Sequence, residues 1–439
     1  MKKEYLKTGY SIVFILAFAL LLLVVFIFGN HKVNDTSEEE EVTELTIVYA
    51  YQNSMWSSFI EKAATEFEAE HPEIDITFQT AYGDTVYETI LNKMIARDEL
   101  GDIVQVKAPE AYVQCGIFGE IPDSVTQLVS EENRYTYKDK TYAVGIVNTT
   151  TGIMYNKALF EKYHLQEPTT YDEFLECCAV LKKHHITPLG IGGSDLWHME
   201  FWVNHFLRTN VLSENEDWFC DCSKGTVSWT DEEITQSLTQ LKDLFDAGYV
   251  NSDWLSTTDG SLPYLLSEGD TAMVMTGPWV EAEVTELNDQ AQWGWFYLPD
   301  EDGQVVVGEN RDTYFAVSAD CQADEKKYQA AEAFLNYFYS SDNYSNLLQS
   351  ITSFSTTKES VEYEKNDFQE EVTEAFTDYE THITGYVGDS DTPEGFETEM
   401  LQLIQQMLQD KISIEKTQKK LQKCWEKYEE SEVDASEEN

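Results

Sequence analysis

The chain has 439 residues, of which 42% are hydrophobic. This length suits about two domains of ordinary size, and this apolar content excludes a disordered chain. Its 81 acidic residues against 29 basic ones give a formal net charge of -52 at pH 7. Because such a surface repels phosphate backbones and anionic lipid headgroups, nucleic acid is excluded as a partner. The acidic residues are spread along the chain, so we expect them over the folded surface.

The first 44 residues predict a membrane anchor and a linker. Residues 12–28 are uniformly apolar, and the uncharged run from Thr8 to Asn30 is long enough to cross a bilayer as a helix. Lysines precede this run and acidic residues soon follow it, which places the N-terminus in the cytoplasm and the body outside. No small-residue cleavage site follows, which favours an uncleaved anchor over a cleaved signal peptide. We predict a signal or anchor transmembrane segment over 1–30 and an acidic linker over 31–44.

The strand and helix patterns alternate from residue 44 onward. A strand over 45–51, a helix with one apolar face over 56–67 and a strand of period two over 74–78 form a βαβ unit. A second helix over 86–95 leads to a short apolar strand at 103–106. Three strands joined by two helices indicate a mostly parallel sheet covered on both faces.

The rest of the chain continues in the same α/β pattern. A hairpin over 134–144 leads to a strand at 152–156, and the spacings Thr170-x-x-Glu173 and Thr230-x-x-Glu233 predict capping boxes at two helix starts. A buried strand over 271–276 ends in Gly277-Pro278-Trp279, with a helix after the proline. Further strands are expected at 293–298 and 313–318, and further helices at 328–339, 396–408 and 414–428.

Seven cysteines are an odd number for an exported protein, so at least one lacks an intramolecular partner. The pairs Cys177-Cys178 and Cys220-x-Cys222 lack the spacing of zinc ligands, which leaves packed thiols or a disulfide. The chain has no Gly-x-Ser-x-Gly, His-Glu-x-x-His or phosphate-binding loop motif. We therefore expect no enzymatic activity, no cofactor and no metal ion.

Four stretches in this order resemble one family: residues 45–78, 142–165, 268–279 and 314–349. Together they are similar to the bacterial extracellular solute-binding proteins of family 1, the carbohydrate-binding receptors of ABC importers that include maltose-binding protein. The resemblance covers roughly residues 45–425. Two features depart from the family pattern, since the lipid-anchoring cysteine is missing and Glu309-Asn310-Arg311-Asp312 stands where a glycine-rich loop is common.

The resemblance implies a two-lobed, periplasmic-binding-protein-like type II fold with a hinge, in addition to the N-terminal transmembrane helix. By this analogy lobe one takes residues 45–152 and 309–352. Lobe two takes residues 153–308 and 353–425, and an acidic tail follows over 426–439. The ligand would lie in the cleft between the lobes.

A neutral sugar presents apolar C–H faces and a rim of hydroxyls, so a receptor needs flat aromatic rings and amide or carboxylate groups. Loops at the carboxyl ends of parallel strands are the expected place for them. These loops supply Tyr51, Gln52, Trp56, Tyr82 and Glu110 as candidate ligand-binding residues. Trp56 could instead pack in the core, Tyr82 could be a turn residue, and Glu110 could be favoured only by the dipole of its helix.

The second half of the chain supplies five more candidates. Asn148 lies in a polar run near the expected hinge, and Trp197 begins an aromatic-rich helix. Trp279 follows from the resemblance, because the Gly-Pro-Trp of the family often stacks its ring on sugar. Arg311 and Asp312 offer a donor and an acceptor, or they form an ion pair with each other on the surface.

The function implied by the resemblance is an extracellular receptor that captures a carbohydrate, an oligosaccharide above all, and delivers it to the permease subunits of an ABC importer. We expect a monomer at the extracytoplasmic face of the cell membrane, held by the N-terminal helix. The alternatives are a membrane-anchored sensor or adhesion module, and a receptor for a non-sugar solute such as a polyamine or peptide, which an acidic cleft tolerates.

Overall fold

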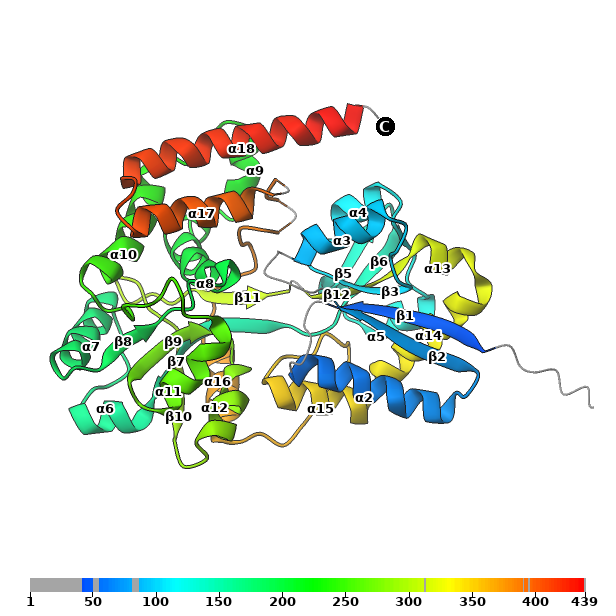
Figure 1. The fold of residues 1–439 in the computed structure, drawn as a ribbon, viewed down its shortest axis with the longest axis horizontal. Coiled ribbons are helices and arrows are strands. Elements are labelled where there is room, and N and C mark those ends of the chain that lie inside the picture. Colours follow the sequence, from blue (N-terminus) through cyan, green and yellow to red (C-terminus); the bar gives the residue numbers. More distant parts are fainter. Residues whose placement is uncertain are drawn as a thin grey trace, which may run out of the picture. The chain divides into compact units, whose positions relative to one another are not determined.

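The computed structural model describes residues 42–437 apart from gaps at 50–54, 81–86, 312, 390 and 394. The predicted anchor, and all but the last three residues of the predicted linker, lie outside the described residues. Within the described part of the chain, no helix has both the length and the apolar character that a bilayer crossing requires. The described residues form two sheets with helices packed on their faces (Figure 1).

The first sheet has seven strands in the order β2-β1-β3-β12-β6-β5, with β4 paired to β12. The predicted βαβ units are confirmed, because β1 is parallel to both β2 and β3. The strands are β1 (Thr43–Tyr49), β2 (Ile74–Thr80), β3 (Ile103–Val106), β4 (Phe118–Gly119), β5 (Arg134–Tyr137), β6 (Lys140–Gly145) and β12 (Tyr314–Ser318).

The expectation of a mostly parallel sheet is wrong for the other half of this sheet. Strand β12 runs antiparallel to β3, with its first residue Tyr314 opposite Val106, the last residue of β3. The chain enters β12 at the carboxyl end of β3, so it can only run back along that strand. The result is a mixed sheet.

Helices cover both faces of the first sheet. On one face α2, α14 and α15 enclose an apolar core in which the rings of Phe67 and Phe334 lie 5.6 Å apart. On the other face α3 and α4 pack over Val104 and Ala316 (Figure 1). The helices are α2 (Met55–Glu70), α3 (Tyr87–Ala96), α4 (Glu110–Gln114), α5 (Asp123–Leu128), α13 (Ala319–Ala323), α14 (Glu325–Phe338) and α15 (Ser341–Ile351), with the 3-10 turn η1 (Glu131–Asn133).

The second sheet has six strands in the order β13-β11-β7-β9-β8, with β10 paired to β7. Its central strand β7 is antiparallel to β9, β10 and β11. The strands are β7 (Thr149–Asn156), β8 (Thr187–Gly190), β9 (Thr271–Thr276), β10 (Trp293–Phe296), β11 (Val307–Asn310) and β13 (His382–Ile383).

The helices of the second half build the largest apolar core of the described residues, with Trp202, Trp229 and Trp425 fully buried in it. Helix α8 contacts both β9 and α17, so it is held from two sides. The helices are α6 (Lys157–Tyr163), α7 (Tyr171–Lys183), α8 (Leu196–Leu207), α9 (Trp218–Ser223), α10 (Glu232–Asp246), α11 (Leu262–Ser267), α12 (Val280–Leu287), α16 (Asp367–Asp378), α17 (Phe396–Leu408) and α18 (Ile414–Glu437), with the short turns η2 (Arg208–Leu212) and η3 (Asp259–Ser261).

The segments that connect the two sheets lie side by side. Asn148, which precedes β7, exchanges two backbone hydrogen bonds of 2.9 and 2.8 Å with Phe354, which follows α15. The Tyr344 hydroxyl donates to the carbonyl of Ile146 at 2.7 Å, and the Tyr339 hydroxyl donates to that of Gly145 at 2.7 Å. These bonds tie the connecting segments to the first half of the molecule. The lobe boundaries that we placed near these segments remain a prediction.

Two predicted capping boxes have different outcomes. The Thr170 hydroxyl accepts from the Glu173 amide at 3.2 Å, while the Glu173 carboxylate accepts from the amide of Thr169, one residue earlier than expected. The box at Thr230 is wrong, because α10 begins at Glu232 with Asp231 as its N-cap residue. The Asp231 carboxylate accepts from the Ser228 amide at 2.7 Å, and this local turn replaces the predicted cap.

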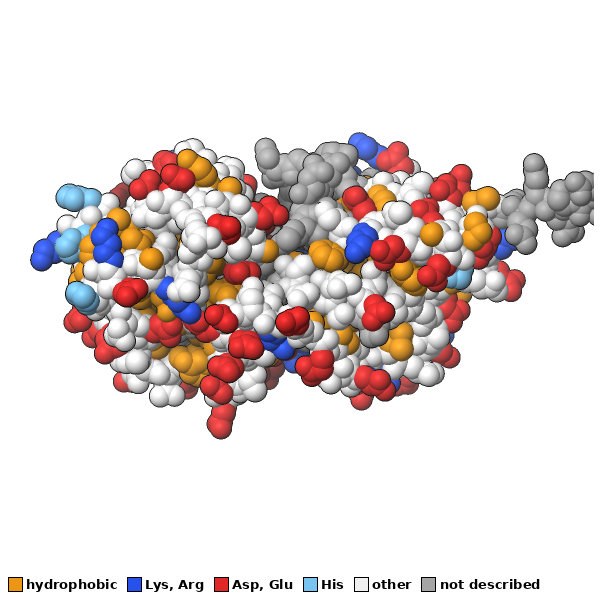
Figure 2. All heavy atoms as spheres, turned by 90° about the horizontal axis from the view of Figure 1, so that it is seen from below, with side chains coloured by type: hydrophobic (Ala, Val, Ile, Leu, Met, Phe, Trp, Pro, Cys, Tyr) orange, Lys and Arg blue, Asp and Glu red, His pale blue; other side chains and the backbone are white. Residues whose placement is uncertain are grey.

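The surface and the cysteines can be compared with the sequence directly. Acidic side chains are scattered over both halves of the face shown in Figure 2, with few basic ones between them, as expected.

All seven cysteines are unpaired; Cys115 is exposed, Cys220 is half-buried and the other five are buried. Packed thiols are therefore the arrangement that the structure shows.

Candidate functional site

Helix α8 presents two neighbouring rows of side chains to one cavity. Residues four apart on a helix lie on the same face. One row begins with Trp197 and Phe201. The other consists of Glu200 and Asn204 of α8 and of Arg208, the first residue of η2, which continues the helix; all five line the same cavity. One helix thus brings an aromatic row and a polar row to a single place.

The cavity has a volume of about 270 Å³ and lies between elements of the two sheets. The first-sheet side contributes Tyr87 from α3, Gln105 and Val106 at the end of β3, and Lys107 directly after it. This is the predicted place, the carboxyl end of a parallel strand. The connecting segments contribute Val147 and Thr313, and the end of α15 contributes Ile351. The second-sheet side contributes Thr149, Thr151, Trp197, Glu200, Phe201, Asn204, Arg208, Asp259, Trp279, Glu283, Asn310 and Tyr386.

Three aromatic rings form one wall of the cavity. The ring centroids of Phe201 and Trp279 lie 6.1 Å apart, and those of Trp197 and Phe201 lie 5.7 Å apart in an edge-to-face arrangement. Trp279 lies over the backbone of Gly277, where an added Cβ would overlap its ring. The glycine of the Gly-Pro-Trp turn is therefore required by the position of this tryptophan. Trp197 keeps 38% of its surface exposed, so part of the wall is open to a ligand.

A hydrogen-bonded network forms the polar wall. The buried Arg208 donates from Nη2 to Asn310 Oδ1 at 2.9 Å, and Asn310 Nδ2 donates to Thr151 Oγ1 at 2.8 Å. Asn204 Nδ2 donates to Glu200 Oε1 at 3.1 Å. These amide, hydroxyl and carboxylate groups are the kinds that hydrogen-bond a hydroxyl-rich ligand.

The edge of the cavity is acidic. Asp259 Oδ1 lies 3.0 Å from Nδ1 of the fully buried His198, and the Asp259 amide donates to Asp195 at 2.8 Å. Loss of water around Glu283, and then the nearby carboxylates of Asp259 and Glu286, raise the pKa of Glu283. In the described part of the chain, no group of three His, Cys, Asp or Glu side chains is placed to hold a metal ion.

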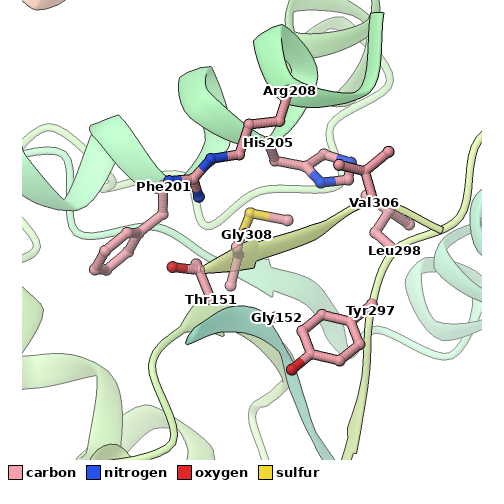
Figure 3. Close-up of a pocket in the computed structure, with 10 residues that line it drawn as sticks. Thr151, Gly152, Phe201, His205, Arg208, Tyr297, Leu298, Val306 and Gly308 are labelled. Carbon is pink, nitrogen blue, oxygen red and sulfur yellow. The ribbon is translucent and has the colours of Figure 1, made fainter. Parts of the chain in front are cut away.

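A second, much smaller void of about 10 Å³ adjoins the cavity and shares Thr151, Phe201 and Arg208 with it (Figure 3). It has room for about one water molecule and cannot hold a solute. Its wall includes His205, whose pKa is lowered to about 3 by burial and by the charge of Arg208. His205 is therefore neutral at physiological pH, and this void is part of the support beneath the cavity.

Five of the ten predicted site residues can be placed in full. Trp197 and Trp279 line the cavity, whereas Glu110, Asn148 and Arg311 are not among the described residues that line it. Their contact with a ligand remains a prediction.

Two of the three other residues bind partners away from the cavity, and the third, Asn148, is buried. Glu110 accepts from Gln114 at 2.9 Å within α4. Asn148 is buried and lies between Val147 and Thr149, which do line the cavity, so it points the other way along an extended segment. Arg311 donates to Glu309 at 2.6 Å.

The remaining predictions lie outside the described residues. Tyr51, Gln52, Tyr82 and Asp312 belong to the gaps, and the alternative ion pair between Arg311 and Asp312 goes with them. Trp56 lies in α2, and its side chain is not described.

The sequence interpretation missed the polar row of α8. The spacing of Glu200, Asn204 and Arg208 places them on one helix face, but the prediction from sequence names only the aromatic Trp197 of this helix. Asn310 belongs to a stretch that departs from the family pattern, and Tyr386 has no local signal. Tyr386 reaches the cavity from a loop that follows β13, far along the chain from the other lining residues.

Comparisons with known proteins agree with this arrangement. Residues 52–344 match the family model of the bacterial extracellular solute-binding proteins. The chain is 22% identical over 319 residues to the multiple sugar-binding protein of Streptococcus mutans, which covers 70% of this chain and 73% of that protein. It is also 22% identical over 327 residues to the melibiose/raffinose/stachyose-binding protein MelE of Bacillus subtilis, which covers 72% of this chain and 75% of that protein.

A solved structure has the same fold. A chitin oligosaccharide binding protein matches with a TM-score of 0.79 and 20% identity, over 89% of this chain and 99% of that chain. The predicted two-lobed α/β fold is thereby confirmed.

Proposed function

Because the chain belongs to the family of bacterial extracellular solute-binding proteins, we propose that it is a receptor that binds a carbohydrate in the 270 Å³ cavity. It acts outside the cytoplasm and delivers its ligand to the permease of an ABC importer. The observation that carries this proposal is the aromatic wall of Trp197, Phe201 and Trp279 beside the polar network of Arg208 and Asn310.

The two walls match the two kinds of surface on a sugar. Aromatic rings favour the apolar C–H faces of a pyranose, and amides and carboxylates hydrogen-bond its hydroxyls. The relatives bearing the names of sugar-binding proteins support this ligand class. Since several rings lie in sequence along one wall, more than one sugar unit can be held, and we propose an oligosaccharide.

We further propose that the protein does no covalent chemistry. Two of the three carboxylates that line the cavity have structural partners, since Glu200 accepts from Asn204 and Asp259 contacts His198. A closed state stabilised by bound ligand would let a permease distinguish loaded receptor from empty receptor.

A second candidate ligand is a cationic solute such as a polyamine or basic peptide. Asp259 and Glu283 favour it, because both carboxylates line the same cavity as the ring of Trp279. No described lysine or arginine forms an ion pair with either carboxylate.

Thermal shift assays of the purified protein separate the two candidates, because a ligand that binds the native state raises the melting midpoint. Raffinose, melibiose and chitotetraose form the sugar panel, and spermidine and a basic peptide form the counter-panel. We expect a rise with at least one sugar. A rise with the cations alone would replace the carbohydrate proposal by the second candidate.

A further inference from the structure

Arg208 lies at the end of the polar row of α8 and is only 4% exposed. It begins η2 (Arg208–Leu212), a single turn of π-helix that continues α8. Such turns are frequent at functional sites, because the extra residue changes the direction of the side chains. Figure 3 shows the Arg208 side chain extending from its helix toward Thr151 and Gly308.

The guanidinium of Arg208 joins two segments that are far apart in the sequence. Its Nε donates to the carbonyl of Gly385 at 2.9 Å, and its Nη2 donates to Asn310 Oδ1 at 2.9 Å. Each segment contributes a cavity-lining side chain at this place, which is Asn310 at the end of β11 and Tyr386 in the loop after β13. One buried side chain therefore sets two parts of the polar wall relative to each other.

The bond to Asn310 also fixes the orientation of its amide. Since Oδ1 accepts from Arg208, the NH₂ group is turned toward Thr151, to which it donates at 2.8 Å. Gly308 makes room for this arrangement, because an added Cβ there would overlap Nη1 of Arg208. A side chain at this strand position would displace the guanidinium.

The loop that carries Tyr386 has further supports from the same helix. The Val387 amide donates to Asn204 Oδ1 at 3.0 Å, so two members of the polar row hold the loop at Gly385 and Val387, on either side of Tyr386. The Tyr386 amide donates to Asp389 Oδ2 at 3.0 Å, which closes the loop on itself. Loss of Arg208 would remove its side-chain link between this loop and Asn310, while β13, which precedes the loop, stays paired with β11.

We infer that Arg208 is a positioning residue that raises ligand affinity by holding Asn310 and Tyr386 in place, an inference that rests on the proposed binding function of the cavity. Arginine suits this role because its planar guanidinium donates in two directions at once, which a lysine ammonium cannot reproduce at a fixed geometry. The variants are Arg208→Gln, Arg208→Lys and Asn310→Ala.

The first experiment needs no sugar. Hydrogen exchange of the ligand-free full chain is compared between wild type, Arg208→Gln and Arg208→Lys. We expect at least tenfold faster exchange in the segment 384–389 and in β11 for both variants, with α14 unchanged. Arg134→Gln is the matched control, because the half-buried Arg134 donates from Nε and Nη2 to the carbonyl of Val129 away from the cavity. Unchanged exchange in both segments would overturn the inference.

The second experiment measures affinity by calorimetric titration with the panel sugar that gives the largest thermal shift. Arg208→Gln and Asn310→Ala are each expected to weaken binding about tenfold. The double variant should lose no more affinity than the single variant with the larger loss, because both substitutions act through the same group. Arg208→Lys is expected to recover less than half of the loss. Additive losses, or full recovery by lysine, would show direct ligand contact or a purely charge-based role and contradict the inference.

The outcomes are distinguishable from a failure of the proposed function. If wild type binds no sugar of the panel, the carbohydrate proposal fails, and the exchange experiment still decides whether Arg208 holds the two segments. If wild type binds sugar and Arg134→Gln weakens binding as much as Arg208→Gln does, the effect reflects general destabilisation and the positioning role is wrong.

Discussion

The two sides of the cavity differ in how they are built. The described residues of the first-sheet side lie at a strand end, where the Tyr87 hydroxyl donates to the carbonyl of Gln105 at 2.8 Å and Lys107 follows β3. The second-sheet side is built on α8 and on the start of α12, and it carries the aromatic wall and the buried network of Arg208. In the part of the chain that the structure describes, the first side is thus a strand end with Tyr87 beside it, and the second is a packed surface that carries three rings.

This difference predicts an unequal division of binding energy. Large rings on a packed support lose little conformational freedom on binding, whereas a lysine loses much of its rotamer freedom. We therefore expect the second-sheet side to supply most of the affinity and the first-sheet side to complete the enclosure. The predictions below test this division.

The largest effect is expected from Trp279→Ala. Removing the ring should weaken sugar binding about a hundredfold, because it deletes one of the three rings of the aromatic wall. Trp279 also packs against the hydrophobic cores of both halves, so a fall of several degrees in the melting midpoint should accompany the loss. Titration calorimetry and a thermal melt measure the two effects.

Trp295→Ala is the matched control for this variant. Trp295 is 1% exposed and is not among the described lining residues, so its loss should cost about 3–5 kcal/mol of stability with unchanged affinity. Equal affinity losses in the two variants would show that the aromatic wall has no special role.

Gly277→Ala keeps the Trp279 ring and moves it. The added methyl group would overlap the ring, so the ring must shift away from its place beside Phe201. We expect about a tenfold loss of affinity, smaller than that of Trp279→Ala because the ring remains. A variant that binds as wild type does would mean that the position of the ring within the wall does not matter.

Lys107→Ala tests the first-sheet side. Lys107 lines the cavity, and its loss should weaken binding by no more than about threefold, because solvent-accessible polar contacts contribute little. A loss comparable to that of Trp279→Ala would reverse the proposed division between the two sides.

The last prediction concerns stability and not affinity, and it rests on the titration of Asp389, which closes the loop of Tyr386. Burial raises the pKa of Asp389 to about 6 despite backbone hydrogen bonds and the charge of Arg208, which lower it, while Asp391 raises it further. The folded protein therefore takes up this proton before the unfolded chain does. As the pH falls from 7 to 4, the free energy of unfolding of wild type should rise relative to that of Asp389→Asn, by at most about 3 kcal/mol.

Denaturant titrations of both proteins at several pH values measure this difference. A difference that stays constant from pH 7 to pH 4 would show that the pKa of Asp389 is not raised in the folded state.

The sequence predicted the fold better than the site. The periodicity of 45–106 gave the first three strands and two helices, because a buried sheet face and a helix face each impose their own spacing. It could not reveal that β12 joins this sheet antiparallel, since that pairing is decided by where the chain returns. Trp279 could be predicted as a site residue from the sequence, because Gly277 and the tryptophan belong to one short Gly-Pro-Trp turn.

The polar wall could not be predicted from the sequence, for a physical reason. Arg208, Asn310 and Tyr386 come together only after the second core has packed, and no local pattern links residues 208, 310 and 386. The spacing of Glu200, Asn204 and Arg208 was the one available signal. This spacing shows only that the three side chains share one helix face. In a protein with so many acidic residues, such a face is equally compatible with exposure to water.

The most direct test of the account is calorimetric titration of wild type and Trp279→Ala with the sugar panel. We predict that wild type binds at least one oligosaccharide near the micromolar range, about -8 kcal/mol, and that Trp279→Ala loses most of this affinity. Binding of spermidine or a basic peptide in place of every sugar, or equal sugar binding by the two proteins, would contradict a carbohydrate receptor whose affinity resides in the aromatic wall.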